Sequence, residues 1–369
     1  MAPAYYFILT AFILSAVLGF IILPKILIIS HKHSLYDLPN NRKNHEVPIP
    51  RLGGVFFFPV IIITITLLMG SRYYLGYDII YIPVRTVLIE FLFLLCGSCI
   101  LFIIGVKDDL VGISYHWKFL AQIMCGFLFA FAGLWIHDGN GLFGIHILKA
   151  RFGYPFAIFI VVYIINSFNL IDGIDGLASG LACISLTTLG TIFIQEKLLI
   201  YALMVFSTIG VVLPFSIYNV FGNQKKGRKI FMGDTGTLTL GLILSFLILK
   251  VCSISTDASQ DKNYFLIGFS TMIIPLFDTV RVAVTRIINH KNPFLPDNNH
   301  IHHRLLKTGM KKRNVIFTIL LLDVMYIYVN KCIIKHFDIN IVLIIDIVIM
   351  IIIQYIVSNI IKKRNNGNS

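Results

Sequence analysis

Apolar residues along this chain gather in long runs rather than in alternating or half-polar patterns. Runs of about 16 to 25 residues with few charges recur from one end to the other, separated by short polar stretches. A helix of about 20 apolar residues spans the roughly 30 Å hydrocarbon core of a bilayer. The pattern therefore predicts an all-α polytopic membrane protein with about eleven transmembrane helices. The predicted spans are about 5–29, 52–70, 83–105, 118–136, 153–168, 177–194, 199–219, 236–252, 264–288, 315–333 and 340–361.

The composition agrees with this pattern and excludes an ordinary soluble protein. Of 369 residues, 57% are hydrophobic and 13% are charged, about half the roughly 25% charged content of a soluble domain. We therefore expect residues 1–369 to form a single integral-membrane domain with no soluble domain. Glycine and asparagine punctuate short apolar pairs in 137–152, which is typical of a short hairpin, here on the external side.

The basic residues predict which side of the membrane each loop faces. The net charge is +13, and in a polytopic protein excess cation marks cytoplasmic loops and anionic headgroups, so no nucleic-acid partner is expected. One set of alternating loops holds 19 lysines and arginines, and the opposite set holds six. This asymmetry predicts an external N-terminus and a cytoplasmic C-terminus. The richer set comprises 30–51, 106–118, 220–235, 289–314 and the tail 362–369.

Five aspartates stand where predicted spans meet the basic face. They are Asp108 and Asp109 at the end of the third span, Asp172 and Asp175 after the fifth, and Asp234 at the start of the eighth. Carboxylates at membrane depth are costly and tend to be functional or paired. Five acids in one place would repel one another, so we expect a Mg²⁺ ion, which is commonly held by carboxylates and substrate phosphates. The alternative is that each aspartate only caps a helix end.

Glycines and amides beside these acids point to phosphate. Gly173 and Gly176 alternate with the acids, and Gly233 precedes Asp234, so backbone amides can approach a ligand closely. The alternative is that such glycines only allow close helix packing in lipid. Asn169 lies three residues before Asp172, which places both on one edge of a helix.

Two basic loops are candidates for anion binding. The last large loop contains His300, His302, His303 and Arg304 in the run HIHHR, for which we favour phosphate contact over a transition-metal site or a plain surface loop. The first loop contains Arg42 and Lys43 among prolines, and such cations either attract lipid phosphate or only set the topology. In the span before HIHHR, Asp278 and Arg281 are three residues apart, and we interpret them as an ion pair.

Five ordered motifs resemble those of the polyprenyl-phosphate N-acetylhexosamine-1-phosphate transferases, relatives of phospho-N-acetylmuramoyl-pentapeptide transferase. They are GVKDDL, NSFNLIDGIDGLASG, FMGDTGTLTLG, PLFDTVRVAVTR and HIHHRL, between about residues 37 and 310. The resemblance implies a multi-pass protein of the bacterial inner membrane with a cytoplasmic, Mg²⁺-dependent site, Mn²⁺ being the substitute ion. It also implies transfer of N-acetylhexosamine 1-phosphate, GlcNAc in the first instance, from a UDP-sugar to undecaprenyl phosphate with release of UMP.

The family's roles can be carried over position by position. The resemblance implies that Asp234 is the principal metal ligand, with Asn169 as a second. It implies that Asp108 and Asp109 handle the metal or activate the lipid phosphate. Catalysis or nucleotide binding would fall to Asp172 and Asp175. The substrate-binding residues it implies are Arg42, Lys43, Lys118, Asn169, Asn219, His300, His302, His303 and Arg304.

Some questions stay open at this level. Arg304 after the histidine pair is typical of the hexosamine branch rather than the muramoyl-pentapeptide branch, and Thr237 stands where the family usually has serine. Asp323 and Asp346 match no motif; pairing with each other or with a buried amide would account for them. The competing class is a secondary transporter, which would place charges near the bilayer midplane. The chemistry is either direct attack by the lipid phosphate or a route through a phospho-aspartate, and homodimer formation is left open.

Overall fold

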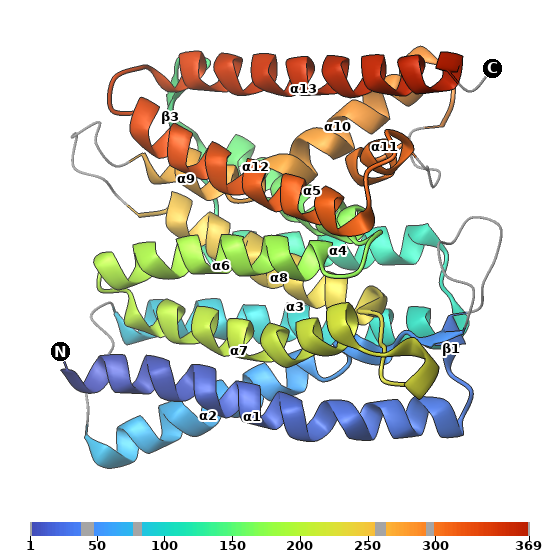
Figure 1. Ribbon diagram of the computed structural model, residues 1–369. Coiled ribbons are helices and arrows are strands. Elements are labelled where there is room, and N and C mark those ends of the chain that lie inside the picture. Colours follow the sequence, from blue (N-terminus) through green and yellow to red (C-terminus); the bar gives the residue numbers. More distant parts are fainter. Residues whose placement is uncertain (1, 38–47, 77–82, 255–262, 293–298, 368–369) are drawn as a thin grey trace.

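The computed structural model describes residues 2–37, 48–76, 83–254, 263–292 and 299–367, and it is a bundle of long helices (Figure 1). The N- and C-termini lie at opposite ends of the bundle (Figure 1). The helices are α1 (Ala2–Lys32), α2 (Phe57–Leu75), α3 (Val84–Val111), α4 (Tyr115–Phe131), α5 (Ala150–Ile171), α6 (Leu177–Gln195), α7 (Leu199–Phe221), α8 (Gly233–Cys252), α9 (Tyr264–Ser270), α10 (Ile273–Ile288), α11 (Ile301–Lys307), α12 (Lys312–Ile333) and α13 (Ile339–Gly367). Short elements complete the chain: β1 (Tyr36–Asp37), β2 (Ile49–Pro50), β3 (Asp138–Leu142), β4 (Ile145–Ile147) and the 3₁₀ turns η1 (Leu52–Gly54) and η2 (Gln224–Lys226).

The helical membrane architecture predicted from the apolar runs is confirmed. Within the described ranges, nine helices are long and apolar enough to cross a membrane, and α9 with α10, bent by 69°, would make a tenth. Each of the eleven predicted spans overlaps a helix, with α9 and α10 sharing the ninth. The fourth predicted span corresponds to α4, which has 17 residues and is not among the nine helices.

Helix α8 runs through the centre of the bundle. It is buried on all sides, between α3, α5 and α6, as expected for a helix that is apolar all round. Its close neighbours fit because they carry glycine where the backbones meet: a Cβ atom on Gly54 would lie 2.1 Å from the Cα atom of Gly236. The start of α8 is therefore held tightly against η1.

The first loop returns to the bundle beside the approach to α8. Strands β1 and β2 pair antiparallel, with Tyr36 opposite Pro50. The Phe231 N–H donates to the Pro50 carbonyl at 2.8 Å, and the Gly53 N–H donates to the Phe231 carbonyl at 2.9 Å. This pairing places Arg51 at the entrance to α8.

The hairpin predicted within 137–152 is present. Strands β3 and β4 pair antiparallel, and Asn340 at the start of α13 holds the turn by accepting from the Phe143 N–H at 2.7 Å. The hairpin therefore ties the middle of the chain to its last helix.

Polar side chains from other helices satisfy the break between α9 and α10. The Ser185 hydroxyl donates to the Thr271 carbonyl at 2.5 Å, and Asn330 donates to the Ser270 hydroxyl at 2.9 Å. Asn330 also donates to Asp346 Oδ2 at 2.8 Å, so Asp346 pairs with a buried amide. Asp323 is fully buried, and neither of its oxygens has a hydrogen-bond partner within the described part of the chain.

Candidate functional site

At the start of α8, two carboxylates from different helices lie beside one lysine, which belongs to α4. Lys118 Nζ, from α4, lies 2.7 Å from Asp108 Oδ2 at the end of α3 and 3.1 Å from Asp234 Oδ1 in the first turn of α8. Asp108 is additionally fixed by the Ile113 N–H, which donates to its Oδ1 at 2.7 Å. Residues more than a hundred positions apart in sequence thus form one charged centre.

Asp234 is oriented from two further sides. Asn169, near the end of α5, donates from Nδ2 to Asp234 Oδ1 at 2.8 Å and to the Thr237 hydroxyl at 2.6 Å. Arg51 Nη2 lies 3.9 Å from Asp234 Oδ2. The Thr237 hydroxyl therefore serves to place Asn169, and Asp234 is surrounded by positive and hydrogen-bond-donating groups.

Asp109 caps helix α8 rather than facing its neighbour Asp108. Its Oδ1 accepts from the Asp234 N–H at 2.8 Å, and its Oδ2 accepts from the Thr235 N–H at 3.0 Å and the Thr235 hydroxyl at 2.6 Å. A carboxylate at a helix N-terminus satisfies free amides and the helix dipole. Gly233 makes room for it, since a Cβ there would lie 2.6 Å from Asp109 Oδ2. The helix-capping alternative is thus the observed geometry for this one of the five acids.

The loop between α5 and α6 brings two more acids to the centre. Asp175 Oδ2 lies 2.7 Å from Lys229 Nζ. Asp172 is half-buried and has no such cation beside it in the described residues. Burial, together with the negative charges of Asp175, Asp234 and Asp109, raises the pKa of Asp172 to about 7. The protonation of Asp172 therefore changes near neutral pH.

The histidine run forms the start of α11, and Asp278 of α10 fixes it. Asp278 Oδ2 lies 2.8 Å from His300 Nδ1, and its Oδ1 accepts from the Ile301 N–H at 2.9 Å. Arg281 Nη2 also donates to Asp278 Oδ1, at 2.7 Å, which confirms the predicted ion pair. The same carboxylate thus serves as a structural anchor for the predicted substrate-binding loop.

His302 connects α11 to the loop that carries Asp172 and Asp175. Its side chain is buried, and a Cβ on Gly173 would lie 2.1 Å from His302 Nε2. Neither ring nitrogen has a hydrogen-bond partner among the residues that the structure describes. Burial, with the nearby His303 and His300, lowers the pKa of His302 to about 3, so the ring is neutral at physiological pH.

Two predicted substrate-binding residues form hydrogen bonds within the protein. Asn219 accepts from the Gly176 N–H at 2.7 Å and donates to the Ile230 carbonyl at 2.8 Å, so its amide joins two backbone segments. Arg304 hydrogen-bonds to Gln354 and Ser358 of α13. Both side chains have partners within the protein, and their contact with a substrate stays a prediction. Arg42 and Lys43 lie outside the described residues.

The sequence patterns missed contacts that depend on packing. The sequence places Lys229 only among the basic residues of its loop and Arg51 only among the cations of the first loop, and it pairs Asp278 only with Arg281. The charge of each residue was visible in the sequence. Its partner was not, because each pair joins segments that only the folded bundle brings together.

The donor set at the start of α8 fits a magnesium ion. In the described ranges, no three His, Cys, Asp or Glu side chains gather into a metal site of their own. Mg²⁺, however, is commonly bound by one or two carboxylates, waters and substrate phosphates. The Asp108 and Asp234 carboxylates converge on a single cationic group, Lys118 Nζ, and they supply hard oxygen ligands of the required kind.

Comparison with known proteins yields one consistent group of relatives. The profile described as "Glycosyl transferase family 4" matches residues 91–252. The chain is 32% identical to the probable undecaprenyl-phosphate N-acetylglucosaminyl 1-phosphate transferase of Bacillus subtilis (strain 168) over 358 residues, which cover 95% of this chain and 91% of that protein. It is 30% identical over 295 residues to the undecaprenyl-phosphate alpha-N-acetylglucosaminyl 1-phosphate transferase of Escherichia coli (strain K12), covering 79% and 75%. For the Yersinia pestis protein of that name the identity is 29% over 293 residues, covering 79% and 74%.

Proposed function

This chain belongs to glycosyl transferase family 4, and from that membership we propose that it transfers N-acetylglucosamine 1-phosphate from UDP-N-acetylglucosamine to undecaprenyl phosphate. The names of its relatives support this choice of sugar and acceptor. The observation that carries the proposal is the convergence of Asp108, Asp234 and Lys118 at the start of α8. Acids and cations gathered at helix ends suit phosphate chemistry better than transport across the midplane.

The reaction that we propose is a direct displacement. An oxygen of the lipid phosphate forms a bond to the β-phosphorus of the UDP-sugar, the bond from that phosphorus to the bridging oxygen breaks, and UMP leaves. A phosphate monoester has its second pKa near ~6, so its dianion needs little general base at neutral pH. Positioning and electrostatics then carry the catalysis.

Charged side chains of the site would hold the two phosphorylated substrates. We assign Lys118 and Arg51 to the diphosphate, because they are the cations beside Asp234. Asp172 and Asp175 would face the nucleotide side. Of the three histidines, His303 is the most exposed, so we assign contact with the UDP-sugar to it.

We propose that Asp108 and Asp234 hold a magnesium ion, with Mn²⁺ as the substitute. When bound, the ion would offset the negative charge of the diphosphate and of the departing UMP. Asn169 would orient Asp234 through its hydrogen bond, and Asp109 would hold the first turn of α8 in place.

The membrane arrangement that we propose has eleven crossings in one domain over 1–369. Each predicted span corresponds to a helix, including α4 and the bent pair α9 and α10. The excess of basic residues at the end that carries the site supports a cytoplasmic active site and an external N-terminus. The protein would lie in a bacterial plasma membrane, where undecaprenyl phosphate is its acceptor.

The test is the reaction itself with purified protein. Radiolabelled UDP-N-acetylglucosamine, undecaprenyl phosphate and Mg²⁺ should give a labelled lipid diphosphate and one UMP for each product. EDTA should abolish product formation and Mg²⁺ or Mn²⁺ should restore it. UDP-N-acetylgalactosamine and UDP-N-acetylmuramoyl-pentapeptide supplied in parallel test the sugar. Absence of a lipid-linked product together with ion flux in liposomes would replace this proposal by transport.

A further inference from the structure

The histidine helix α11 is too short to hold its own shape. It has seven residues, less than two full turns, and a helix of that length is not stable in isolation. External contacts must therefore fix its position. Figure 1 shows α11 beside the C-terminal end of α13.

Contacts hold α11 at both ends. At its start, the carboxylate of Asp278 accepts from the Ile301 N–H and lies beside His300, as described above. At its end, Arg364 of α13 donates to the Lys307 carbonyl at 3.2 Å. The Arg364 guanidinium also lies against Gly309, where a Cβ would come within 2.5 Å of Nη1. The C-terminal part of α13 therefore contributes to the second support.

Arg304 makes the central contact between α11 and α13. Its Nη1 donates to the Gln354 side-chain oxygen, and its Nη2 donates to the Ser358 hydroxyl and, at 3.4 Å, to the Gln354 carbonyl. Gln354 and Ser358 are four residues apart and so lie on one face of α13. The acceptors are neutral groups on a helix, and both terminal nitrogens of the guanidinium are used.

The opposite face of α11 reaches the site. His302, two residues before Arg304, packs on Gly173 between Asp172 and Asp175. The seven-residue helix α11, held by its contacts, therefore connects a contact on α13 with the loop that carries two acids of the site.

We propose that Arg304 is a positioning residue. Its partners Gln354 and Ser358 of α13, which we call the brace, hold α11 in place so that His302 packs against the loop 172–175. This rests on the proposed transferase function for its effect on rate. The brace lies beyond the residues matched by the family profile, 91–252. It replaces the direct substrate contact that the sequence implied for Arg304.

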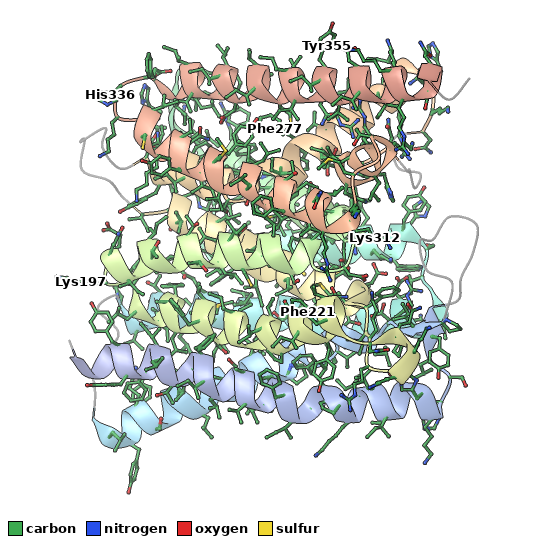
Figure 2. All side chains as sticks on the ribbon, in the orientation of Figure 1. Lys197, Phe221, Phe277, Lys312, His336 and Tyr355 are labelled. Atoms are coloured by element: carbon green, nitrogen blue, oxygen red, sulfur yellow. The ribbon has the colours of Figure 1, made fainter. Side chains whose placement is uncertain are left out.

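The experiment compares two faces of α13. Gln354→Ala with Ser358→Ala removes the brace, and Ile351→Ala with Tyr355→Ala removes two exposed side chains at the same spacing; Tyr355 points away from the bundle (Figure 2). We expect the brace variant to lose about tenfold in kcat/KM, equivalent to about 1.4 kcal/mol, and the control variant to match wild type. Gln354→Glu, which keeps an acceptor for Arg304, should retain activity.

A double-mutant cycle separates positioning from substrate contact. If Arg304 acts through α13, adding Arg304→Ala to the brace variant should cost little more than either change alone. Hydrogen exchange of amides 301–308 should accelerate in both, whether or not the protein makes any lipid-linked product. Ser358→Ala alone gives a milder variant if the double one unfolds. Full activity and unchanged exchange in the brace variants, with loss only in Arg304→Ala, would overturn the proposal.

Discussion

Adjacent aspartates of the site have different structural roles. Asp108 faces Lys118, whereas both oxygens of Asp109 bind the first amides of α8. Asp108→Asn and Asp234→Asn should therefore lower kcat by about 10²- to 10³-fold or more with little change in thermal stability. Asp109→Asn should in addition lower the free energy of unfolding by about 1 to 2 kcal/mol, because it turns an amide group toward helix N–H donors.

Activity and thermal unfolding of the three variants check this distinction. Asp138→Asn, at an exposed position of the β3 hairpin, is the control and should change neither quantity. Equal thermal stability of the Asp109 and Asp108 variants would show that Asp109 is not a structural cap.

Asp172 should make the protein less stable as the pH rises. Its pKa is raised to about 7 in the folded protein from an ordinary value of 3.8, so between about pH 4 and pH 7 the folded state binds more protons than the unfolded state. Stability from this group is thus complete below about pH 4 and falls as the pH approaches 7. Asp172→Asn removes the charge and should raise the melting temperature at pH 8 by about 2 to 5 °C, allowing for solvent screening.

The measurement is the melting temperature at pH 5 and pH 8. We expect the variant to gain more at pH 8 than at pH 5, because part of the loss is already present at pH 5, while its transferase activity falls. A variant that loses activity and stability alike at both values would mean that the carboxylate is needed for packing.

At the scale of elements, the contact between η1 and α8 fixes the position of the site. A Cβ on Gly54 would meet backbone atoms of Gly236 at 2.1 and 2.3 Å, and backbone cannot move aside as a flexible side chain can. We expect Gly54→Ala to cost about 1 to 3 kcal/mol or more, seen as a lower melting temperature.

Gly70→Ala is the matched control. Gly70 lies inside α2 with nothing within 4 Å of its added Cβ. Alanine favours a helix over glycine by about 1 kcal/mol, so this variant should be unchanged or slightly more stable. A tolerated Gly54→Ala would show that η1 can separate from α8.

Helices could be predicted from the sequence where the run of apolar residues that forms them is itself visible in the segment. The apolar runs predict the ends of every long helix, with α9 and α10 taken together, to within six residues; for example, 118–136 is expected and α4 covers Tyr115–Phe131. The break within 264–288 was not predicted, because the run is continuously apolar. It is stable because Ser185 and Asn330, on other helices, satisfy its polar groups. Such partners are not visible in the segment itself.

The site could be predicted in part for the same reason. Helix ends at one face of a membrane lie in one layer, so the positions of the five aspartates alone predict that they share that face. The pairing of Asn169 with Asp234 is implied by the family resemblance. Which atom binds which was not predictable. The direction of Arg304 toward α13, and of Asp109 toward the amides of α8, depends on helix packing across the whole bundle.

At the scale of the whole molecule, the distribution of charge predicts how the bundle is inserted. Lys197 and Lys312 lie at opposite ends of the bundle (Figure 2), and both side chains are exposed. With an external N-terminus, position 197 faces outward and position 312 faces the cytoplasm, where basic loops are retained.

In a variant whose six cysteines are replaced by alanine or serine, Lys197→Cys should react with a membrane-impermeant maleimide on intact cells. Lys312→Cys should react only after the cells are opened. Retained transferase activity is the control for folding. The reverse labelling pattern would place the site outside the cell, away from any supply of UDP-sugar. It would therefore contradict both the proposed topology and the proposed function.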